Sequence, residues 1–245
     1  MEGSPSGSAK AVTIGQNDRS KPTLTAYTIE TVESSPFAQN AYLLWRQGEA
    51  SALVFDPGFD TWSLRRWLEN QRLGLAAILN THGHADHIAG NRTMKEVYPD
   101  APLYIGRNEA FLLNDPEANM SGPFGQPLVS PEADRLVSDG ERIKLGGFDL
   151  EVREIPGHSP GSVVFLCDEF DPYFVLGGDV LFSGSIGRTD LGGDFSKLMS
   201  GIHAKLFTLP DSTVVYPGHG PPTTVGAEKR SNPFVGAASG HYRLN

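Results

Sequence analysis

Three histidines and an aspartate fall within six residues of this chain, directly after an apolar run. The apolar run, 75–79, predicts a buried strand, and the segment 88–97 behind it predicts a helix. Between them, residues 81–87 read Thr-His-Gly-His-Ala-Asp-His. A strand that ends here exposes these side chains on a loop before the chain turns into a helix. The sequence therefore predicts a strand-to-helix turn that carries four potential metal ligands.

Imidazole and carboxylate groups bind zinc, iron and manganese without help from thiolates. His82 and His84 lie two positions apart, so in an extended segment their side chains point to one side and suit one metal. Asp86 and His87 follow the turn and face differently, which suits a second metal close by. A polar loop that is merely rich in histidine is the alternative, but three of the chain's seven histidines lie here.

Three later turns each add one residue of the same kind after an apolar strand. His158 lies among turn-forming residues, Asp179 follows two glycines, and His219 lies between Gly218 and Gly220. Each turn taken alone is compatible with a purely structural role, because Asp and Gly are common turn residues. Together, five of the seven histidines and two aspartates fall in loops that follow strands. This arrangement favours one metal cluster built from loops.

Composition limits the partners and the compartment. A formal net charge of −9 and an isoelectric point near 5.2 argue against nucleic acid as a partner. No run approaches the roughly 18 apolar residues of a membrane span, and no apolar signal-peptide core is present, which favours a cytoplasmic protein. The single cysteine, Cys167, lies in an apolar run and is expected to be a buried, inert thiol rather than a nucleophile.

The chain divides into three expected parts: a flexible extension over residues 1–20, a folded domain over 21–235 and a tail over 236–245. Within the domain, two sets of strands are each followed by helices, which predicts two packed sheets with helices outside. The expected strands cover 24–32, 40–45, 52–55, 75–79, 103–105, 150–155, 162–166, 173–176 and 213–216. The expected helices cover 62–71, 88–97, 108–113, 194–207 and 227–230. The irregular segment 115–131 either covers a site or runs over the surface.

The motifs resemble those of the metallo-β-lactamase-fold hydrolases, whose signature is a T-H-x-H-x-D-H loop with a later His, a later Asp and a final His. Within that family the chain is most similar to short glyoxalase II-like enzymes, through the segments 177–182, 184–190 and 217–234. The resemblance covers roughly residues 24–235. It implies an α+β fold, the four-layer αβ/βα sandwich, with the site along one edge of the two sheets.

The resemblance also implies two divalent metal ions, zinc first, with iron or manganese as alternatives. Its ligand set in this sequence is His82, His84 and His158 for one metal and Asp86, His87 and His219 for the other, with Asp179 bridging them. Asp56 matches a further family position. It is expected either to accept hydrogen bonds that hold the histidine loop or to be a plain Asp-Pro-Gly turn.

The implied activity is hydrolysis of a thioester, with an S-(2-hydroxyacyl)glutathione such as S-lactoylglutathione as the small-molecule substrate. Two metals that share a water lower its pKa and yield hydroxide near neutrality, and Asp86 would orient this hydroxide and later carry a proton. Glutathione conjugates carry carboxylates, so basic contacts are expected from Arg188, Lys229 and Arg230, for which solvated surface charge is the alternative. The protein would act as a monomer or a homodimer.

Several alternatives remain within or near this family. A persulfide dioxygenase with one iron keeps the same ligands, but typically shows a cysteine at the position of Ser185-Ile186 and a His-Asp-Tyr-like end at His219-Gly220. Long glyoxalase II enzymes add a C-terminal helical domain, whereas only residues 220–245 follow His219 here. A β-lactamase is less favoured, because the common lactamases have a cysteine at the counterpart of the bridging position. A metal-binding protein without activity would be expected to have lost a ligand.

Overall fold

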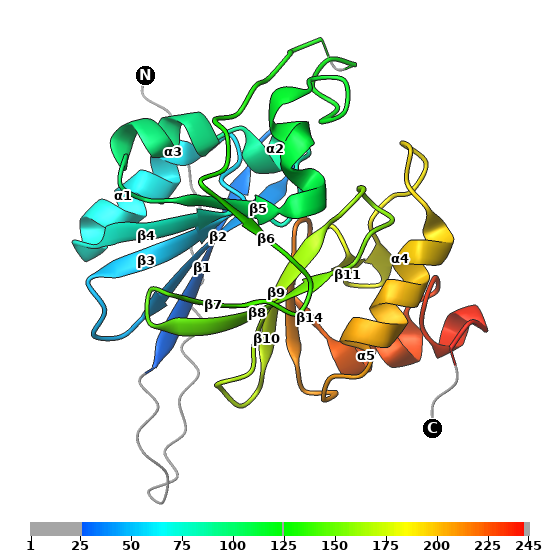
Figure 1. The fold of residues 1–245 in the computed structure, drawn as a ribbon. Helices are drawn as coiled ribbons and strands as arrows, with labels where there is room; N and C mark the ends of the chain where they lie inside the picture. Colours follow the sequence, from blue (N-terminus) through cyan, green and yellow to red (C-terminus); the bar gives the residue numbers. More distant parts are fainter. Residues whose placement is uncertain (1–25, 124, 243–245) are drawn as a thin grey trace, which may run out of the picture.

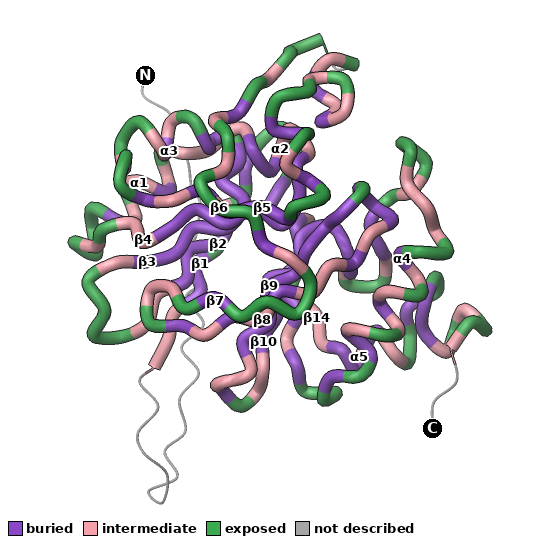
Figure 2. The backbone as a smooth tube through the Cα atoms, in the orientation of Figure 1, coloured by how far each residue is buried: buried purple, intermediate pink, exposed green. Residues whose placement is uncertain are grey.

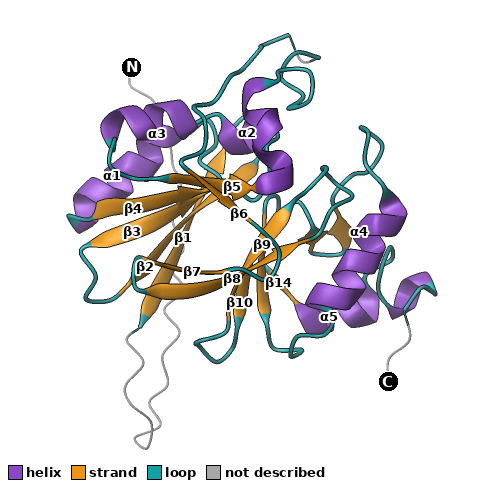
Figure 3. Cartoon of the chain, viewed as in Figure 1, coloured by secondary structure: helices purple, strands orange, loops and turns teal. Residues whose placement is uncertain are grey.

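Two mixed β-sheets face each other and carry helices on both outer surfaces (Figure 1, Figure 3). The computed structural model describes residues 26–123 and 125–242, so the extension expected over residues 1–20 lies outside the described residues. Helices α1 and α3 lie on one side of the molecule, and α4 and α5 lie on the other. The expected four-layer αβ/βα sandwich is therefore confirmed.

The first sheet has the strand order β1-β2-β3-β4-β5-β6. Its strands are β1 (Tyr27–Ser34), β2 (Gln39–Arg46), β3 (Ser51–Phe55), β4 (Gly74–Leu79), β5 (Leu103–Gly106) and β6 (Arg135–Val137). The first three strands pair antiparallel and the remaining pairs are parallel. Parallel pairs need crossover connections, which supply the helices of this half. These helices are α1 (Thr61–Gln71), α2 (Ala85–Ile88), α3 (Asn91–Val97) and the 3₁₀-helix η1 (Arg107–Asn114).

The second sheet has the order β14-β13-β10-β9-β8-β7, and a separate hairpin pairs β11 with β12. The strands are β7 (Arg142–Leu145), β8 (Phe148–Glu154), β9 (Val163–Cys167), β10 (Phe174–Gly178), β11 (Leu181–Phe182), β12 (Ser185–Ile186), β13 (Val214–Pro217) and β14 (Thr223–Thr224). Its helices are α4 (Phe195–Gly201), the π-helical turn η2 (Ile202–Leu206), α5 (Val225–Ser231) and the 3₁₀ turn η3 (Ala237–Ser239).

The core is divided by the sheets into an inner layer and two outer layers (Figure 2). The inner layer joins both sheets and includes Phe55, Phe165 and Phe174, each fully buried. One outer layer packs the first sheet against α1 and α3, and the other packs the second sheet against α4 and α5. Cys167 lies in the inner layer, where burial raises the pKa of its thiol to about 12. The expected buried, inert cysteine is confirmed.

The two sheets are joined at the edge where β4, β9 and β13 meet. Val163 donates its backbone N–H to the carbonyl of Thr81, and Asn40 donates its own to the carbonyl of Gly218. Tyr42 adds a side-chain bond from its hydroxyl to the Pro217 carbonyl, at 2.6 Å. Several loops follow the strands at this edge of the sandwich. The bonds fix the positions of these loops relative to each other.

The helix expected over 88–97 is wrong in its extent, because two short helices replace it. Gly90 separates α2 from α3 and donates its N–H to the carbonyl of Pro57 at 2.7 Å. A β-carbon at Gly90 would lie only 2.6 Å from the carbonyl oxygen of Gly58, so the chain approaches this turn too closely for a side chain. In the described part of the chain, none of the helices is long and apolar enough to cross a lipid bilayer.

Candidate metal centre

All seven sequence-predicted ligand residues meet at the joined edge of the two sheets. Each of them follows a strand. His82 and His84 lie between β4 and α2, and Asp86 and His87 lie in α2 itself. The other three lie in the second half of the chain, after β8, β10 and β13: His158, Asp179 and His219. The fold thus converts four separate loops into one cluster.

Three imidazoles form the first part of the cluster, named here the imidazole trio: His82, His84 and His158. Nε2 of His158 lies 3.0 Å from Nδ1 of His84 and 3.3 Å from Nε2 of His82. The ring of His158 is oriented by its other nitrogen, which donates to the carbonyl of Arg188 at 2.9 Å. One potential ligand atom from each ring lies within 4.8 Å of the others.

A carboxylate and two imidazoles form the second part, named here the mixed trio: Asp86, His87 and His219. Nε2 of His219 lies 3.3 Å from a carboxylate oxygen of Asp86. The His219 ring is oriented by its Nδ1, which donates to the carbonyl of Phe37 at 3.2 Å. His87 is oriented in the same way by Asp56, at 3.0 Å. Such bonds to the far nitrogen of an imidazole fix its tautomer and leave the near nitrogen for a metal.

The carboxylate of Asp179 lies between the two trios. Its Oδ1 is 3.3 Å from Nε2 of His87. Its Oδ2 is 3.5 Å from Nε2 of both His158 and His219. Gly218 lies against it so closely that a β-carbon there would be 2.1 Å from Oδ1. A single carboxylate thus faces both halves of the cluster.

Unpaired buried atoms indicate that the cluster suits cations. Nε2 of His87 and Oδ1 of Asp179 are buried and lie 3.3 Å apart, and neither atom makes a well-formed hydrogen bond among the described residues. Such atoms are costly in a folded protein unless a ligand satisfies them. Burial and the charge of His158 lower the pKa of His84 to about 4, and burial with the neighbouring imidazoles holds the pKa of His82 well below its usual range. Neutral imidazoles are the form that binds metal, so these residues fit divalent ions.

Asp56 connects both trios through hydrogen bonds. Its oxygens accept from the backbone N–H and the hydroxyl of Thr81, at 2.7 and 2.6 Å. The Thr81 oxygen in turn lies 3.1 Å from Nδ1 of His82, and Asp56 itself accepts from Nδ1 of His87. Asp56 adopts a left-handed backbone conformation, with φ of 47°, at the end of β3. Among the two expectations for this residue, these contacts match the one in which it holds the histidine loop.

Glu109 is a site residue that the sequence reasoning did not identify. It lies in η1 with no exposed surface. One carboxylate oxygen accepts from the N–H of Gly83, between two histidines of the trio, at 2.9 Å. The other accepts from the Ser159 hydroxyl at 2.8 Å and from the N–H of Gly161, both in the loop of His158. The available signal was weak, a glutamate directly before the apolar run 110–113 of a short helical segment.

The three basic residues expected near the substrate separate in the structure. Arg188 lines the cavity at the cluster, and its guanidinium pairs with Asp190 through two bonds of 2.8 Å. Lys229 and Arg230 lie on α5, pair with Asp211, and are not among the residues that line this cavity. Only Arg188 therefore lies where a bound substrate would meet it.

The cavity over the cluster has a volume of about 320 Å³. Its floor holds residues of both trios and Asp179, and its walls are largely apolar. The apolar wall residues are Phe37, Met120, Phe182, Ile186 and Leu191. Met120 belongs to the irregular segment 115–131, so this segment forms part of the wall. The size, and the apolar wall around a polar floor, are typical of a small-molecule site.

Comparison with known proteins agrees with this geometry. The family model described as Metallo-beta-lactamase superfamily matches residues 34–219. Hydroxyacylglutathione hydrolase GloC of Haemophilus influenzae is 38% identical over 215 residues, which cover 86% of this chain and 99% of that protein. The crystal structure of the B3 metallo-beta-lactamase BLEG-1 aligns with a TM-score of 0.80 and 39% identity, over 84% of this chain and 99% of that one. TTHA1623, crystallised in a di-iron-bound form, aligns with a TM-score of 0.71 and 35% identity, over 83% and 98%.

Proposed function

The chain belongs to the metallo-beta-lactamase superfamily and is a metal-dependent hydrolase, and from that premise we propose that it cleaves thioesters of glutathione with two metal ions. The single observation that carries this proposal is the position of Asp179, within 3.5 Å of imidazole nitrogens from both trios. A carboxylate between two sets of ligands suits a pair of cations better than one.

The imidazole trio would hold one ion, the mixed trio the other, and Asp179 both. Zinc is proposed first, and the di-iron form of TTHA1623 supports iron as an alternative. When bound, two such ions supply Lewis acidity and a water of lowered pKa. Asp86 lines the cavity beside His219 and is proposed to accept a proton from the attacking water and to pass it on.

The chemistry of a thioester suits the groups that this chain offers. A thiolate is a good leaving group, so no strongly acidic side chain is needed beside it. The single cysteine is buried with a raised pKa, which agrees with direct attack by water instead of a covalent intermediate. Arg188 lies at the cavity wall and is proposed to contact a carboxylate of the glutathione arm. The name of GloC supports this choice of substrate.

The test is steady-state hydrolysis of S-lactoylglutathione by protein whose metal content has been measured, with His84→Ala as the control. Turnover that disappears in the control, at about two metals per chain, is the expected result. Two bound metals without turnover would contradict the glutathione assignment. If the protein binds one iron per chain and consumes oxygen when glutathione persulfide is added, the assignment changes from a hydrolase to a dioxygenase.

Hydrolysis of β-lactams is a second candidate, favoured by the similarity to BLEG-1. The same metal-loaded protein is to be assayed with a chromogenic cephalosporin in parallel. We expect the thioester to be cleaved at a kcat/KM at least about 100-fold higher, a ratio that corresponds to roughly 3 kcal/mol of transition-state discrimination. The opposite ratio would make the protein a lactamase.

A further inference from the structure

A second and larger cavity adjoins the metal centre. Its volume is about 870 Å³, and Phe37 and Ala85 line both this cavity and the one over the cluster. It lies between the loop that joins β1 to β2, the connection from β3 to α1 at Phe59, the helices α2 and α3, and residues 121 and 126–130. We name it the acyl groove. The two cavities therefore share a border at Phe37 and Ala85.

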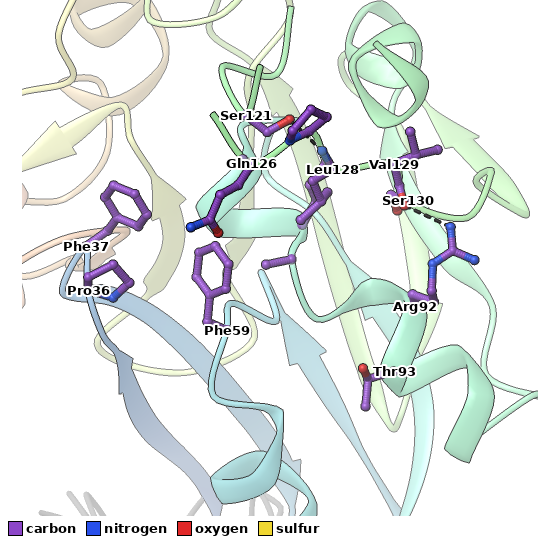
Figure 4. Close-up of a pocket in the computed structure, with 14 residues that line it drawn as sticks. Pro36, Phe37, Phe59, Arg92, Thr93, Ser121, Gln126, Leu128, Val129 and Ser130 are labelled. Carbon is purple, nitrogen blue, oxygen red and sulfur yellow. Dashed lines mark hydrogen bonds between the residues drawn. The ribbon is translucent and has the colours of Figure 1, made fainter. Parts of the chain in front are cut away.

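The walls of the acyl groove near the cluster are formed by two aromatic rings, with the Gln126 amide beside them (Figure 4). Phe37 and Phe59 stand side by side there, with ring centroids 6.0 Å apart, and each is 42% exposed (Figure 4). Val129, farther along the groove, is 44% exposed. Large apolar side chains left exposed around one hollow are typical of a binding surface. Both rings line the groove, and the Phe37 ring also lines the cavity over the cluster.

Charge marks the other end of the acyl groove. Arg92 is the single charged residue among the fourteen described residues that line it. Figure 4 shows Arg92 at the end away from Phe37, where its Nη2 donates to the carbonyl of Val129 at 2.9 Å. A guanidinium carries five N–H donors, and this bond occupies one of them. The groove thus combines an apolar stretch with a fixed cation.

We propose that the acyl groove binds the acyl arm of the thioester, and that the preferred acyl arm is extended, apolar and ended by a carboxylate that pairs with Arg92. This inference rests on the proposed thioesterase function and adds to it the class of acyl group. A lactoyl group is too small to leave the cavity over the cluster, so the groove would be unused by S-lactoylglutathione.

The two arms of a thioester diverge from the carbonyl carbon, and the structure offers one direction for each. Arg188 and Leu191 line the cavity over the cluster but not the acyl groove, whereas Phe59 and Arg92 line the groove but not that cavity. A glutathione arm carries several charged groups, which the apolar end of the groove would leave without partners. The acyl arm is the part of the substrate that matches it.

The experiment compares three thioesters of glutathione on the metal-loaded protein: lactoyl, octanoyl and 7-carboxyheptanoyl. We expect kcat/KM to rise about tenfold or more from lactoyl to octanoyl, because several methylenes are buried in the groove, and to rise again with the terminal carboxylate. Phe59→Ala should remove most of the gain for both long substrates. Arg92→Ala should remove only the gain that the carboxylate adds, and Arg92→Lys should restore part of it.

Phe111→Ala is the matched control, because Phe111 is an exposed phenylalanine, at 53%, that does not line the groove. It should leave the preference among the three substrates unchanged. Equal kcat/KM for all three substrates, with rapid turnover of the lactoyl thioester, would overturn the groove assignment while the thioesterase function stands. A second comparison replaces the glutathione of the thioester by N-acetylcysteamine. If the loss of kcat/KM in Phe59→Ala depends on the thiol and not on the acyl chain, the groove assignment is also overturned.

A binding measurement separates the inference from the proposed function. Acetate and octanoate share the carboxylate that a metal centre would attract, so the difference in their affinities reports the apolar chain alone. Calorimetry should show octanoate binding about tenfold or more tightly than acetate, and Phe59→Ala should abolish the difference. This result without turnover of any thioester would refute the proposed function and keep the groove as a site for an acyl chain. Equal affinities would overturn the groove assignment.

Discussion

The imidazole trio and the mixed trio share Asp179, yet they are supported in different ways. The loops of the imidazole trio are tied together by Glu109, a fully buried carboxylate that accepts from Gly83, Ser159 and Gly161. The mixed trio depends on a carbonyl in the connection between β1 and β2, since Phe37 orients His219. The His219 side chain is 28% exposed, whereas that of His158 is 3% exposed.

This contrast indicates a division of roles within one cluster. The loops of the imidazole trio are held together from both halves of the chain by Glu109, as a fixed site requires, although His84 and His158 also line the cavity. In the mixed trio, His87 is fully buried, but His219 is 28% exposed and is supported by the same short loop whose Phe37 side chain lines the acyl groove. The substrate is therefore expected to approach over the mixed trio. Two kinds of substitution test this division of roles. Some change residues that both trios share, and others change residues that support only one trio.

The largest effect is expected from Asp179→Ala, because the Asp179 carboxylate lies within 3.5 Å of imidazole nitrogens from both trios. Activity should fall by about 10³-fold or more, since both ions lose a ligand. Metal content per chain, measured by mass spectrometry, should fall below two. A variant that keeps two tightly bound metals would show that the trios bind independently, and the shared role of Asp179 would be wrong.

Asp56→Asn is expected to be next in size. The amide keeps the shape of the side chain but replaces one acceptor by a donor, which cannot accept from both Thr81 and His87. Loss of such a partner typically costs about 10- to 100-fold in metal affinity or activity. Both trios should be weakened, because Thr81 contacts His82 while Asp56 contacts His87. Chelator competition on the variant measures the metal affinity of each trio. If the affinity of one trio is unchanged, Asp56 supports only the other trio.

Much of the metal centre could be predicted from the sequence, because its residues stand in local patterns. Two histidines at spacing two, and single ligands placed after apolar strands, depend only on strand geometry and turn chemistry. Glu109 could not be predicted in this way. Its partners lie in loops from both halves of the chain, and only the packing of η1 against them makes this glutamate a buried acceptor.

The fold was predictable to a similar depth. Long apolar strands such as β2 and β9 were expected, whereas the two-residue strands β11, β12 and β14 carry too few residues for a periodic pattern. The division of one expected helix at Gly90 depends on the nearby turn at Pro57, a contact between distant parts of the chain. The acyl groove has the same origin, since its walls come from four separate segments.

Glu109→Ala tests the support of the imidazole trio by itself. Three donors lose their acceptor in the interior, so we expect a loss of roughly 3 kcal/mol in the free energy of unfolding. Metal affinity of the imidazole trio should fall about tenfold, measured in a His219→Ala background that leaves this trio complete. Glu109→Gln, which keeps one carbonyl oxygen as an acceptor, should recover part of the affinity.

Glu228→Ala is the matched control for Glu109→Ala. Glu228 is also buried, and it accepts from Gly184, Thr223 and Asn232, none of which lies in a ligand loop. Denaturant unfolding should show a similar loss of stability in the two variants, with metal affinity lowered only in Glu109→Ala. Equal losses of affinity would mean that Glu109 acts through general stability and does not position the histidines.

The smallest effect is expected from Arg188→Ala, although Arg188 takes part in both the metal centre and the cavity wall. Its carbonyl accepts from His158 and remains in the alanine variant, so metal content should not change. Its guanidinium is exposed and already pairs with Asp190, and exposed ion pairs contribute little, so KM for a glutathione thioester should rise only about two- to fivefold. Asp190→Ala frees the guanidinium and should lower KM by a similar factor, whereas Lys229→Ala, on α5, should leave it unchanged. An unchanged KM in both Arg188→Ala and Asp190→Ala would remove Arg188 from the substrate contacts, and the open side of the cluster would then select its substrate through the acyl groove alone.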